Sequence, residues 1–120
     1  GDGMANEDNC PVEATLELIG GKYKALILWH LSQGILRFSE LRQVIKGATP
    51  KMLTQQLREL EADGLIARKV YNEVPPKVEY SMTEIGVLTQ PFLQALHTFG
   101  GQYKRLYLQA GGTAEAGKNA

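Results

Sequence analysis

The feature that most constrains this chain is a sharply two-sided segment between Thr49 and Gly64. Thr49 is a favourable helix N-cap, Pro50 suits the first helical position, and Gly64 is a typical helix terminator. Between them, apolar and polar residues alternate at helical spacing. The apolar side holds Leu53, Leu57 and Leu60, and the polar side holds Lys51, Thr54, Gln55 and Arg58. The pattern predicts a helix over residues 50–63 that buries its leucines and presents its polar side to solvent.

Shorter helical patterns precede this segment, and a hairpin pattern follows it. Helices are predicted over about 11–19, 22–32 and 38–46, and strands over 66–71 and 77–82, with Pro75-Pro76 in the loop between the strands. Thr83 is expected to cap a long C-terminal helix, which Pro91 bends or restarts and which Gly100-Gly101 can break again. This order predicts a mainly α fold with a small β-hairpin (α+β), arranged as a winged helix-turn-helix.

The composition is that of one globular domain, with 120 residues, 43% hydrophobic and 22% charged. Residues 10–110 are predicted to form this domain, between a flexible N-terminus (1–9) and a flexible tail (111–120). The longest apolar run, residues 25–29, is far shorter than the ~20 residues that a membrane span needs, so no membrane association is expected. Cys10 is the single cysteine, which excludes an internal disulfide and favours a reducing, cytoplasmic setting.

The charge distribution is more informative than the net charge, which is zero. Residues 1–21 contain five acidic side chains and no Lys or Arg, whereas residues 22–58 contain seven basic side chains against Glu40 alone. A chain this polarised can present a basic face to a polyanion although its total charge is neutral. The alternative is that these charges are scattered over a solvated surface.

The polar side of the 50–63 helix has the chemistry of base recognition. An α-helix about 10–12 Å across fits the major groove of double-stranded DNA. Lys51 and Arg58 can address guanine, Gln55 can address adenine with two hydrogen bonds, and Thr54 can contact a base or a phosphate. The acidic residues of the helix come only near its C-terminal end, away from the end that recognition helices dock. The alternative is an ordinary amphipathic helix with a solvated polar face.

Basic residues elsewhere are candidates for contacts to the DNA backbone. On the hairpin, Arg68, Lys69 and Lys77 can lie along phosphates or reach into the minor groove, although charge on such a hairpin can also serve only to prevent aggregation. Thr49 lies at a helix N-terminus, whose free N–H groups favour a nearby phosphate. The remaining phosphate candidates are Arg37 and Arg42 and, less directly, Lys22, Lys24 and Lys46.

Six sequence blocks occur together over residues 10–100. They are CPVE (10–13), IGGKYK (19–24), FSEL (38–41), TPKMLT (49–54), LRELEADGLI (57–66) and VPPKVEY (74–80). In this order they resemble the HxlR family of bacterial transcriptional regulators. The resemblance implies a winged-helix homodimer on operator DNA, with recognition helix 50–63, wing 68–80, and a dimer interface formed by the N- and C-terminal helices. Tyr23 stands where tryptophan is common in the family.

The predicted C-terminal helix supplies a separate argument for a homodimer. It carries more apolar residues than a small winged domain needs to bury, and an exposed stripe of this kind marks an interface. Pairing about a two-fold axis would hide the stripe and place two recognition helices about 34 Å apart, one turn of DNA. The alternative is that the helix folds back onto its own domain. The predicted interface consists of Val12, Leu16, Phe92, Leu96, Phe99, Tyr103 and Leu106.

Cys10 precedes Pro11 at a predicted helix N-terminus, which stabilises a thiolate. Some members of the resembled family sense quinones, aldehydes or oxidants through a cysteine in this context. The resemblance therefore implies a small electrophile or oxidant as an effector. The alternative, favoured by Glu13 and Glu17 nearby, is that Cys10 is a small packing residue at the dimer interface.

Other chemistries find little support in the sequence. His30 and His97 have no cysteine or carboxylate at ligand spacing, so neither a metal nor a cofactor is expected. Nucleophile motifs, glycine-rich phosphate loops and paired histidine–carboxylate clusters are missing from the sequence, so catalytic residues and enzyme activity are not expected. A DNA-binding transcriptional regulator is the leading prediction, and a protein-interaction winged-helix module without DNA binding is the alternative.

Overall fold

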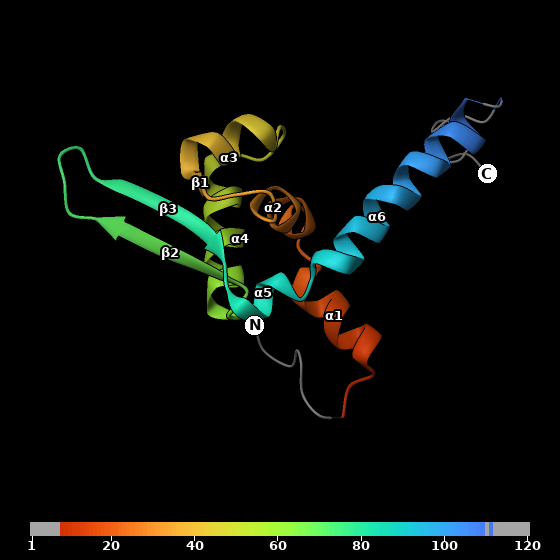
Figure 1. Cartoon of the computed structure of the whole chain (residues 1–120), viewed down its shortest axis with the longest axis horizontal. Helices are drawn as coiled ribbons and strands as arrows, with labels where there is room; N and C mark the ends of the chain where they lie inside the picture. Colours follow the sequence, from red (N-terminus) through yellow and green to blue (C-terminus); the bar gives the residue numbers. More distant parts are fainter. Residues whose placement is uncertain (1–7, 110, 112–120) are drawn as a thin grey trace. The chain divides into compact units, whose positions relative to one another are not determined.

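A computed structural model describes residues 8–109 and 111 of the chain. The predictions of flexibility for residues 1–7 and 112–120 lie outside the described residues. The chain divides into two compact units, with the boundary between Gln90 and Pro91. The first unit contains the helices and strands of the predicted winged domain, and the second contains most of the C-terminal helix (Figure 1).

The described residues of the first unit form five helices and three strands. The two strands of the hairpin match their predicted bounds, and the predicted 22–32 helix begins two residues late, at Lys24. The predicted 50–63 helix ends one residue earlier, at Ala62, with Asp63 as its C-cap. In chain order the elements are α1 (Pro11–Ile19), α2 (Lys24–Leu31), β1 (Leu36–Arg37), α3 (Phe38–Val44), α4 (Pro50–Ala62), β2 (Ile66–Tyr71), β3 (Lys77–Met82) and α5 (Glu84–Val87).

The core of the first unit lies where α2, α3 and α4 pack together. Their apolar faces supply side chains that are almost fully removed from solvent, and α4 contributes the leucine stripe that its sequence pattern predicts. Because this stripe is buried, the rotation of α4 about its own axis is fixed by packing. The buried side chains are Ile27, Leu28 and Leu31 of α2, Leu41 and Ile45 of α3 and its C-cap, and Leu53, Leu57 and Leu60 of α4.

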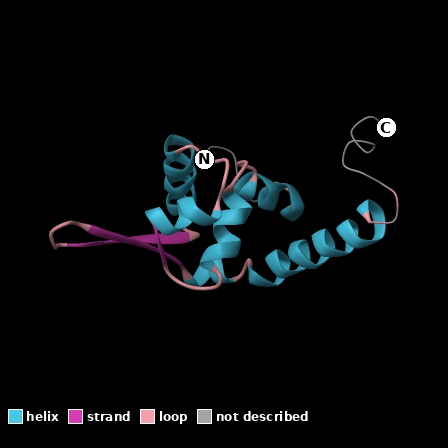
Figure 2. Cartoon of the chain, turned by 90° about the horizontal axis from the view of Figure 1, so that it is seen from above, coloured by secondary structure: helices cyan, strands magenta, loops and turns pink. Residues whose placement is uncertain are grey.

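The three strands form an antiparallel sheet in the order β1-β3-β2. Arg68 and Leu36 both pair with Tyr80, from opposite edges of β3. The sequence analysis did not predict β1, because two residues are too few to show a strand period. Figure 2 shows β2 and β3 as a long hairpin that projects from the helices of this unit, as a wing does.

The turn between α4 and β2 is tightly fixed. Gly64 adopts a left-handed conformation (φ +79°), which ends the helix as its sequence position predicts. The Thr83 hydroxyl donates to the Gly64 carbonyl at 2.6 Å, and the Thr83 N–H donates to the Leu65 carbonyl at 3.1 Å. Gly86 packs so closely that a Cβ there would overlap the Leu65 carbonyl oxygen. These contacts attach the base of the wing to the end of α4.

The second unit is the C-terminal helix. The structure confirms a restart near Pro91, because α5 ends at Val87 and α6 runs over Gln90–Tyr103. The expectation that Gly100-Gly101 breaks the helix is wrong: α6 passes through both glycines, which weaken a helix but keep their backbone hydrogen-bonding groups. A π-helical segment, η1 (Lys104–Leu108), continues it. Within the described part of the chain, none of the helices has the length and apolar character needed to cross a bilayer.

Candidate nucleic-acid interface

The polar face of α4 points to solvent. Thr49 caps the helix by accepting a hydrogen bond from the Met52 N–H at 3.1 Å, and Pro50 occupies the first turn, as predicted. With its leucines buried, the helix leaves Lys51, Gln55 and Arg58 exposed and Thr54 half-buried. The structure therefore brings all four predicted base-contact residues onto one accessible face.

This face forms one wall of an open hollow of about 680 Å³ between α4 and the start of α3. The lining residues are Phe38, Pro50, Lys51, Thr54, Gln55, Arg58, Glu59 and Ala62.

The turn before α2 holds α4 from its other side. The Tyr23 N–H donates to Gln56 Oε1 at 2.8 Å, and the Tyr23 hydroxyl donates to the Gly47 carbonyl, in the turn between α3 and α4, at 3.0 Å. A Cβ on Gly21 would lie 2.9 Å from Gln56 Oε1. Gly20-Gly21 therefore makes a turn that packs on α4. Sequence reasoning missed the positioning roles of Tyr23 and Gln56, for which the chain offers no local motif.

An ion pair between a buried lysine and a partly exposed glutamate connects the same turn to the polar face. Lys24, almost fully buried, places its Nζ 2.6 Å from Glu59 Oε1, and the other oxygen of Glu59 accepts from Gln55 Nε2 at 3.2 Å. The hydrogen bond from Lys24, with help from Gln55, holds the pKa of the Glu59 carboxyl below its ordinary value of 4.5. The prediction of Lys24 as a phosphate contact is wrong, because the ammonium faces Glu59 inside the protein.

On the wing, two lysines lie close to one aromatic ring. Lys69 Nζ and Lys77 Nζ lie 4.8 and 4.7 Å from the centre of the Tyr71 ring, within cation–π range. The Tyr71 hydroxyl donates to Glu79 Oε1 at 2.7 Å, while Lys77 Nζ is 3.5 Å from Glu79 Oε2. The Tyr71 hydroxyl, and then Lys77, keep the pKa of Glu79 below its ordinary value. Arg68 and Lys69 are exposed, and Lys77 is half-buried.

Helix α4 and the wing meet at a second, smaller hollow of about 250 Å³. Arg58 from the helix and Arg68 from β2 both line it, with Thr54, Glu61 and Tyr80. A predicted base contact and a predicted wing contact therefore border the same depression. The arrangement makes the helix face and the root of the wing one continuous surface.

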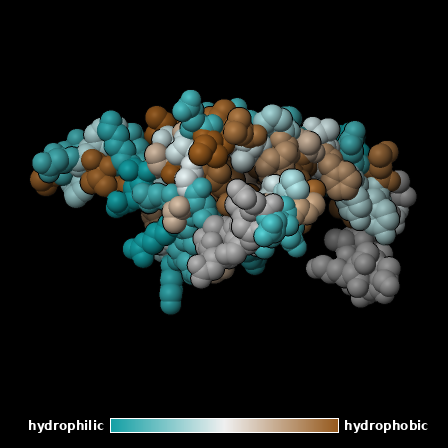
Figure 3. All heavy atoms as spheres, turned by 90° about the horizontal axis from the view of Figure 1, so that it is seen from below, coloured by the Kyte–Doolittle hydropathy of each residue, from teal (hydrophilic) through white to brown (hydrophobic). Residues whose placement is uncertain are grey.

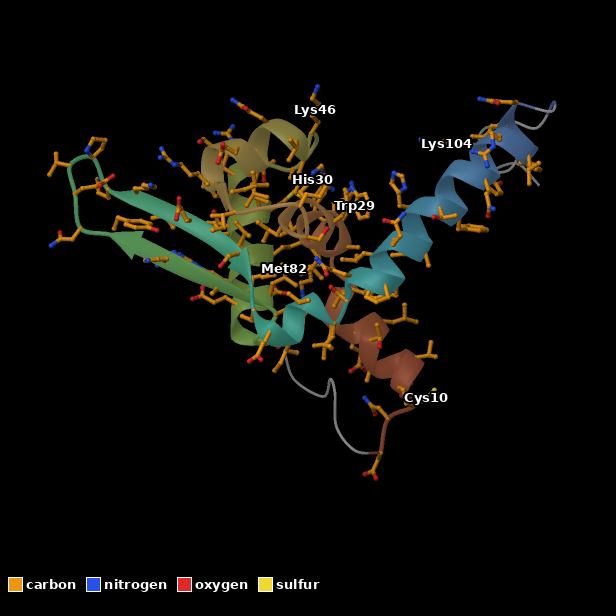
Figure 4. The ribbon with its side chains drawn as sticks, viewed as in Figure 1. Cys10, Trp29, His30, Lys46, Met82 and Lys104 are labelled. Atoms are coloured by element: carbon orange, nitrogen blue, oxygen red, sulfur yellow. The ribbon has the colours of Figure 1, made fainter. Side chains whose placement is uncertain are left out.

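The remaining predicted backbone contacts lie around α3. Arg37 is the N-cap of α3, where its backbone N–H donates to Glu40 Oε1 at 2.8 Å, and its side chain is exposed. Arg42 is exposed on α3, and Thr49 is exposed at the start of α4. Figure 4 shows Lys46 projecting from the end of α3.

Apolar side chains line both α1 and the C-terminal helix. On α1, Val12 and Leu16 are 67% and 59% exposed. On the C-terminal helix, Phe92 is half-buried, whereas Leu96, Phe99, Tyr103 and Leu106 are exposed. The rings of Phe99, Tyr103 and Tyr107 follow one another with centroids 6.1 and 5.1 Å apart. Figure 3 shows brown, hydrophobic residues along the C-terminal helix.

Cys10 is the N-cap of α1 and its side chain is exposed. Figure 4 places it at the outer end of α1, away from α4. Among residues 8–109 and 111, no three His, Cys, Asp or Glu side chains come together as a metal-binding group.

Known proteins match this chain in sequence and in structure. The family described as HxlR-like helix-turn-helix matches residues 18–107. The HTH-type transcriptional regulators YkvN and YtcD of Bacillus subtilis (strain 168) are 56% and 55% identical over 95 and 100 residues, which are 79% and 82% of this chain and 80% and 79% of theirs.

Two solved structures show the same fold. The crystal structure of YtcD is 54% identical, with a TM-score of 0.76 over 81% of this chain and 99% of that one. The redox regulator HypR in its oxidised form is 49% identical, with a TM-score of 0.74 over 78% of this chain and 96% of that one.

Proposed function

This chain belongs to the family of HxlR-like helix-turn-helix transcriptional regulators, and from that premise we propose that it reads operator DNA with α4 in the major groove. It is a DNA-binding regulator of transcription. The observation that supports α4 as the reading element is its orientation: the leucine side is buried and the polar side faces outward. We also propose that the protein acts in the cytoplasm, where the operator DNA of such regulators is located.

The four polar residues on the exposed face of α4 that were predicted to contact bases each have a role in this proposal. Arg58 and Lys51 donate to the O6 and N7 acceptors of guanine, and Gln55 pairs with the N6 and N7 atoms of adenine. Thr54, which is half-buried, contacts a base edge or a phosphate close to the helix. These contacts supply sequence preference, since base edges carry the code that phosphates lack.

The wing and the surroundings of α3 supply affinity. Arg68, Lys69 and Lys77 lie along the phosphates or in the minor groove beside the site that α4 reads. The hollow that Arg58 and Arg68 share supports this assignment, because it joins the wing root to the helix face. Arg37, Arg42 and Thr49 contact phosphates on the other side of α4.

The exposed apolar residues of the terminal helices support a homodimer. Val12, Leu16, Leu96, Phe99 and Leu106 leave large apolar areas in water in a single chain. With Phe92 and Tyr103 they form the proposed interface. A two-fold dimer would present two copies of α4 to successive major grooves about 34 Å apart.

Selection of bound duplexes from random DNA at several salt concentrations tests the DNA-reading proposal. We expect a two-fold symmetric sequence preference and an affinity that falls steeply with salt, because Lys and Arg contacts release condensed counterions. Binding without sequence preference would contradict the reading role of α4. Failure to bind any duplex would favour the alternative, a winged-helix module that contacts proteins.

We further propose that Cys10 makes DNA binding responsive to an oxidant or a small electrophile. Its thiol is exposed at a helix N-terminus, and the similar protein HypR is a redox regulator. With peroxide, two Cys10 thiols lose two protons and two electrons to form an intersubunit disulfide, and the peroxide is reduced to water. We expect oxidant to change DNA affinity in the natural protein and not in Cys10→Ser. An equal change in both proteins would eliminate this role.

A further inference from the structure

The side chain of Gln55 is held by a neighbour on the same helix. Its Nε2 donates to Glu59 Oε2 at 3.2 Å, one helical turn further along α4. The other oxygen of Glu59 lies 2.6 Å from Lys24 Nζ. The side chain of Lys24 is only 7% exposed, so this ammonium has little freedom to move, whereas that of Glu59 is 41% exposed and reaches the surface.

The chemistry of these groups fixes the direction of the amide. A carboxylate only accepts hydrogen bonds, and an amide carries its donors on nitrogen and its acceptor on oxygen. Gln55 must therefore turn Nε2 toward Glu59, which leaves Oε1 and the second N–H of Nε2 available to a ligand. One acceptor and one donor side by side are what the N6 and N7 atoms of adenine require.

We propose that Glu59, held by Lys24, is a specificity-determining positioning residue that orients the Gln55 amide for adenine before DNA arrives. The proposal rests on the proposed insertion of α4 into the major groove. Preorganisation raises affinity for adenine because a fixed side chain loses less conformational entropy when it binds. It raises discrimination because a base that needs the flipped amide would break the Gln55–Glu59 hydrogen bond.

The contacts behind α4 explain why the orientation is stable. Lys24 begins α2, and the preceding residue, Tyr23, donates its N–H to Gln56. The start of α2 thus holds α4 at two neighbouring points, Gln56 and Glu59. A buried lysine also needs its partner, since an unpaired ammonium in the interior is strongly unfavourable. Glu59 is therefore held in place by the core and positions a group at the surface.

Replacing the carboxylate tests the proposal. Glu59→Met removes both acceptor oxygens and keeps the side-chain stem. Glu84→Met is the matched control, because it removes the same charge from an exposed position on α5, outside the proposed DNA-binding surface. In selection from random DNA, we expect Glu59→Met to reduce the preference for adenine about 5-fold, a fraction of the discrimination of a bidentate pair. Glu84→Met should keep that preference.

The base position at which Glu59→Met weakens the preference shows whether Glu59 acts through Gln55. Glu59→Met should weaken the same base position as Gln55→Ala, and the double variant should lose no more than Gln55→Ala alone, because coupled residues are not additive. Additive effects, or effects at different base positions, would overturn the proposal and indicate that Glu59 contacts DNA directly. NMR relaxation of the Gln55 side-chain amide should show an ordered group in the free natural protein and a mobile one in Glu59→Met; equal mobility would also overturn it.

A second pair of variants removes the risk that Glu59→Met fails to fold with Lys24 left unpaired. Lys24→Met/Glu59→Gln retains an acceptor oxygen, whereas Lys24→Met/Glu59→Met does not, and both leave no unpaired ammonium in the interior, because Met replaces the buried lysine. We expect the first to retain the adenine preference and the second to lose it. Equal preference in the two folded proteins would overturn the positioning role. If the natural protein selects no sequence, the reading function of α4 fails; if it selects and Glu59→Met selects equally, only the positioning role fails.

Discussion

Helix α4 and the wing carry similar charges but are supported in different ways. The leucine face of α4 is buried in the core, and its polar face is tied to α2 through Gln56 and Glu59. The wing extends away from the helices of its unit, and its lysines are arranged mainly by Tyr71 and Glu79 on the hairpin itself (Figure 2). Side chains that must match base edges need a rigid support, such as the core provides for α4. Side chains that contact phosphates can be supported within the hairpin alone, because phosphate contacts carry no sequence information.

The two regions should therefore respond differently to substitution. Changes behind α4 should alter stability and sequence preference together. Changes on the wing should alter affinity and its dependence on salt, with little effect on the fold. The contrast separates residues that recognise the base sequence from residues that contribute affinity on any sequence, within a single DNA-binding surface.

The largest expected effect follows from removing the core support of α4. Leu57→Ala opens a cavity under the recognition face and should cost about 2–5 kcal/mol in the free energy of unfolding. The matched change on the wing, Val70→Ala, alters an exposed side chain and should stay within about 0.5 kcal/mol. Urea denaturation of both variants measures the difference. Similar losses would show that the wing is part of the core.

The next effect concerns the reading face itself. Arg58→Ala should cost about 1–3 kcal/mol of DNA binding and relax preference at one base pair, if its guanidinium holds a guanine. Affinity for a selected operator and for variants of each base pair measures this. An equal loss on every sequence would instead assign Arg58 to a phosphate, together with Arg68 in their shared hollow.

A smaller effect is expected from the wing. Lys69→Ala should weaken binding about equally on all sequences and reduce the slope of log affinity against log salt by about 1, as expected when one phosphate contact is lost. A change in base preference without a change in slope would contradict the proposed division between helix and wing. Lys104→Ala, on the C-terminal helix, is a charge-matched control for which no DNA contact is proposed.

Much of this surface could be predicted from sequence because its determinants are local. The Thr49 cap, the leucine stripe and Gly64 lie on one continuous segment, so helical spacing alone places the polar residues on one face. The supports of that face could not be predicted. Tyr23 and Gln56 are 33 residues apart in the sequence, so no local pattern relates them. The sequence gives no sign that Lys24 is buried, because its burial beside Glu59 results from tertiary packing.

The difference between local and tertiary determinants also applies to two features that the sequence did not predict correctly, strand β1 and the helix through Gly100-Gly101. Strand β1 has only two residues and exists because β3 offers an edge to pair with, which no local pattern reveals. Gly100-Gly101 resembles a helix break because glycine is a poor helix former, yet the helix continues on both sides. Pairing with β3 accounts for the first case, and in the second α6 continues through both glycines.

The smallest expected effect is electrostatic, and it compares the two carboxylates that organise the two regions. Lowered pKa values mean that Glu59 and Glu79 stabilise the folded state above their ordinary pKa of 4.5, and that this stabilisation is lost as pH falls through the lower folded-state values. Tyr71→Phe removes the donor to Glu79, so the pKa of Glu79 should rise toward 4.5 while that of Glu59 stays unchanged. Lys24→Met should raise the pKa of Glu59 and leave that of Glu79 unchanged. NMR titration of the carboxyl carbons measures both, and a shift of both groups in either variant would mean that helix and wing are electrostatically coupled.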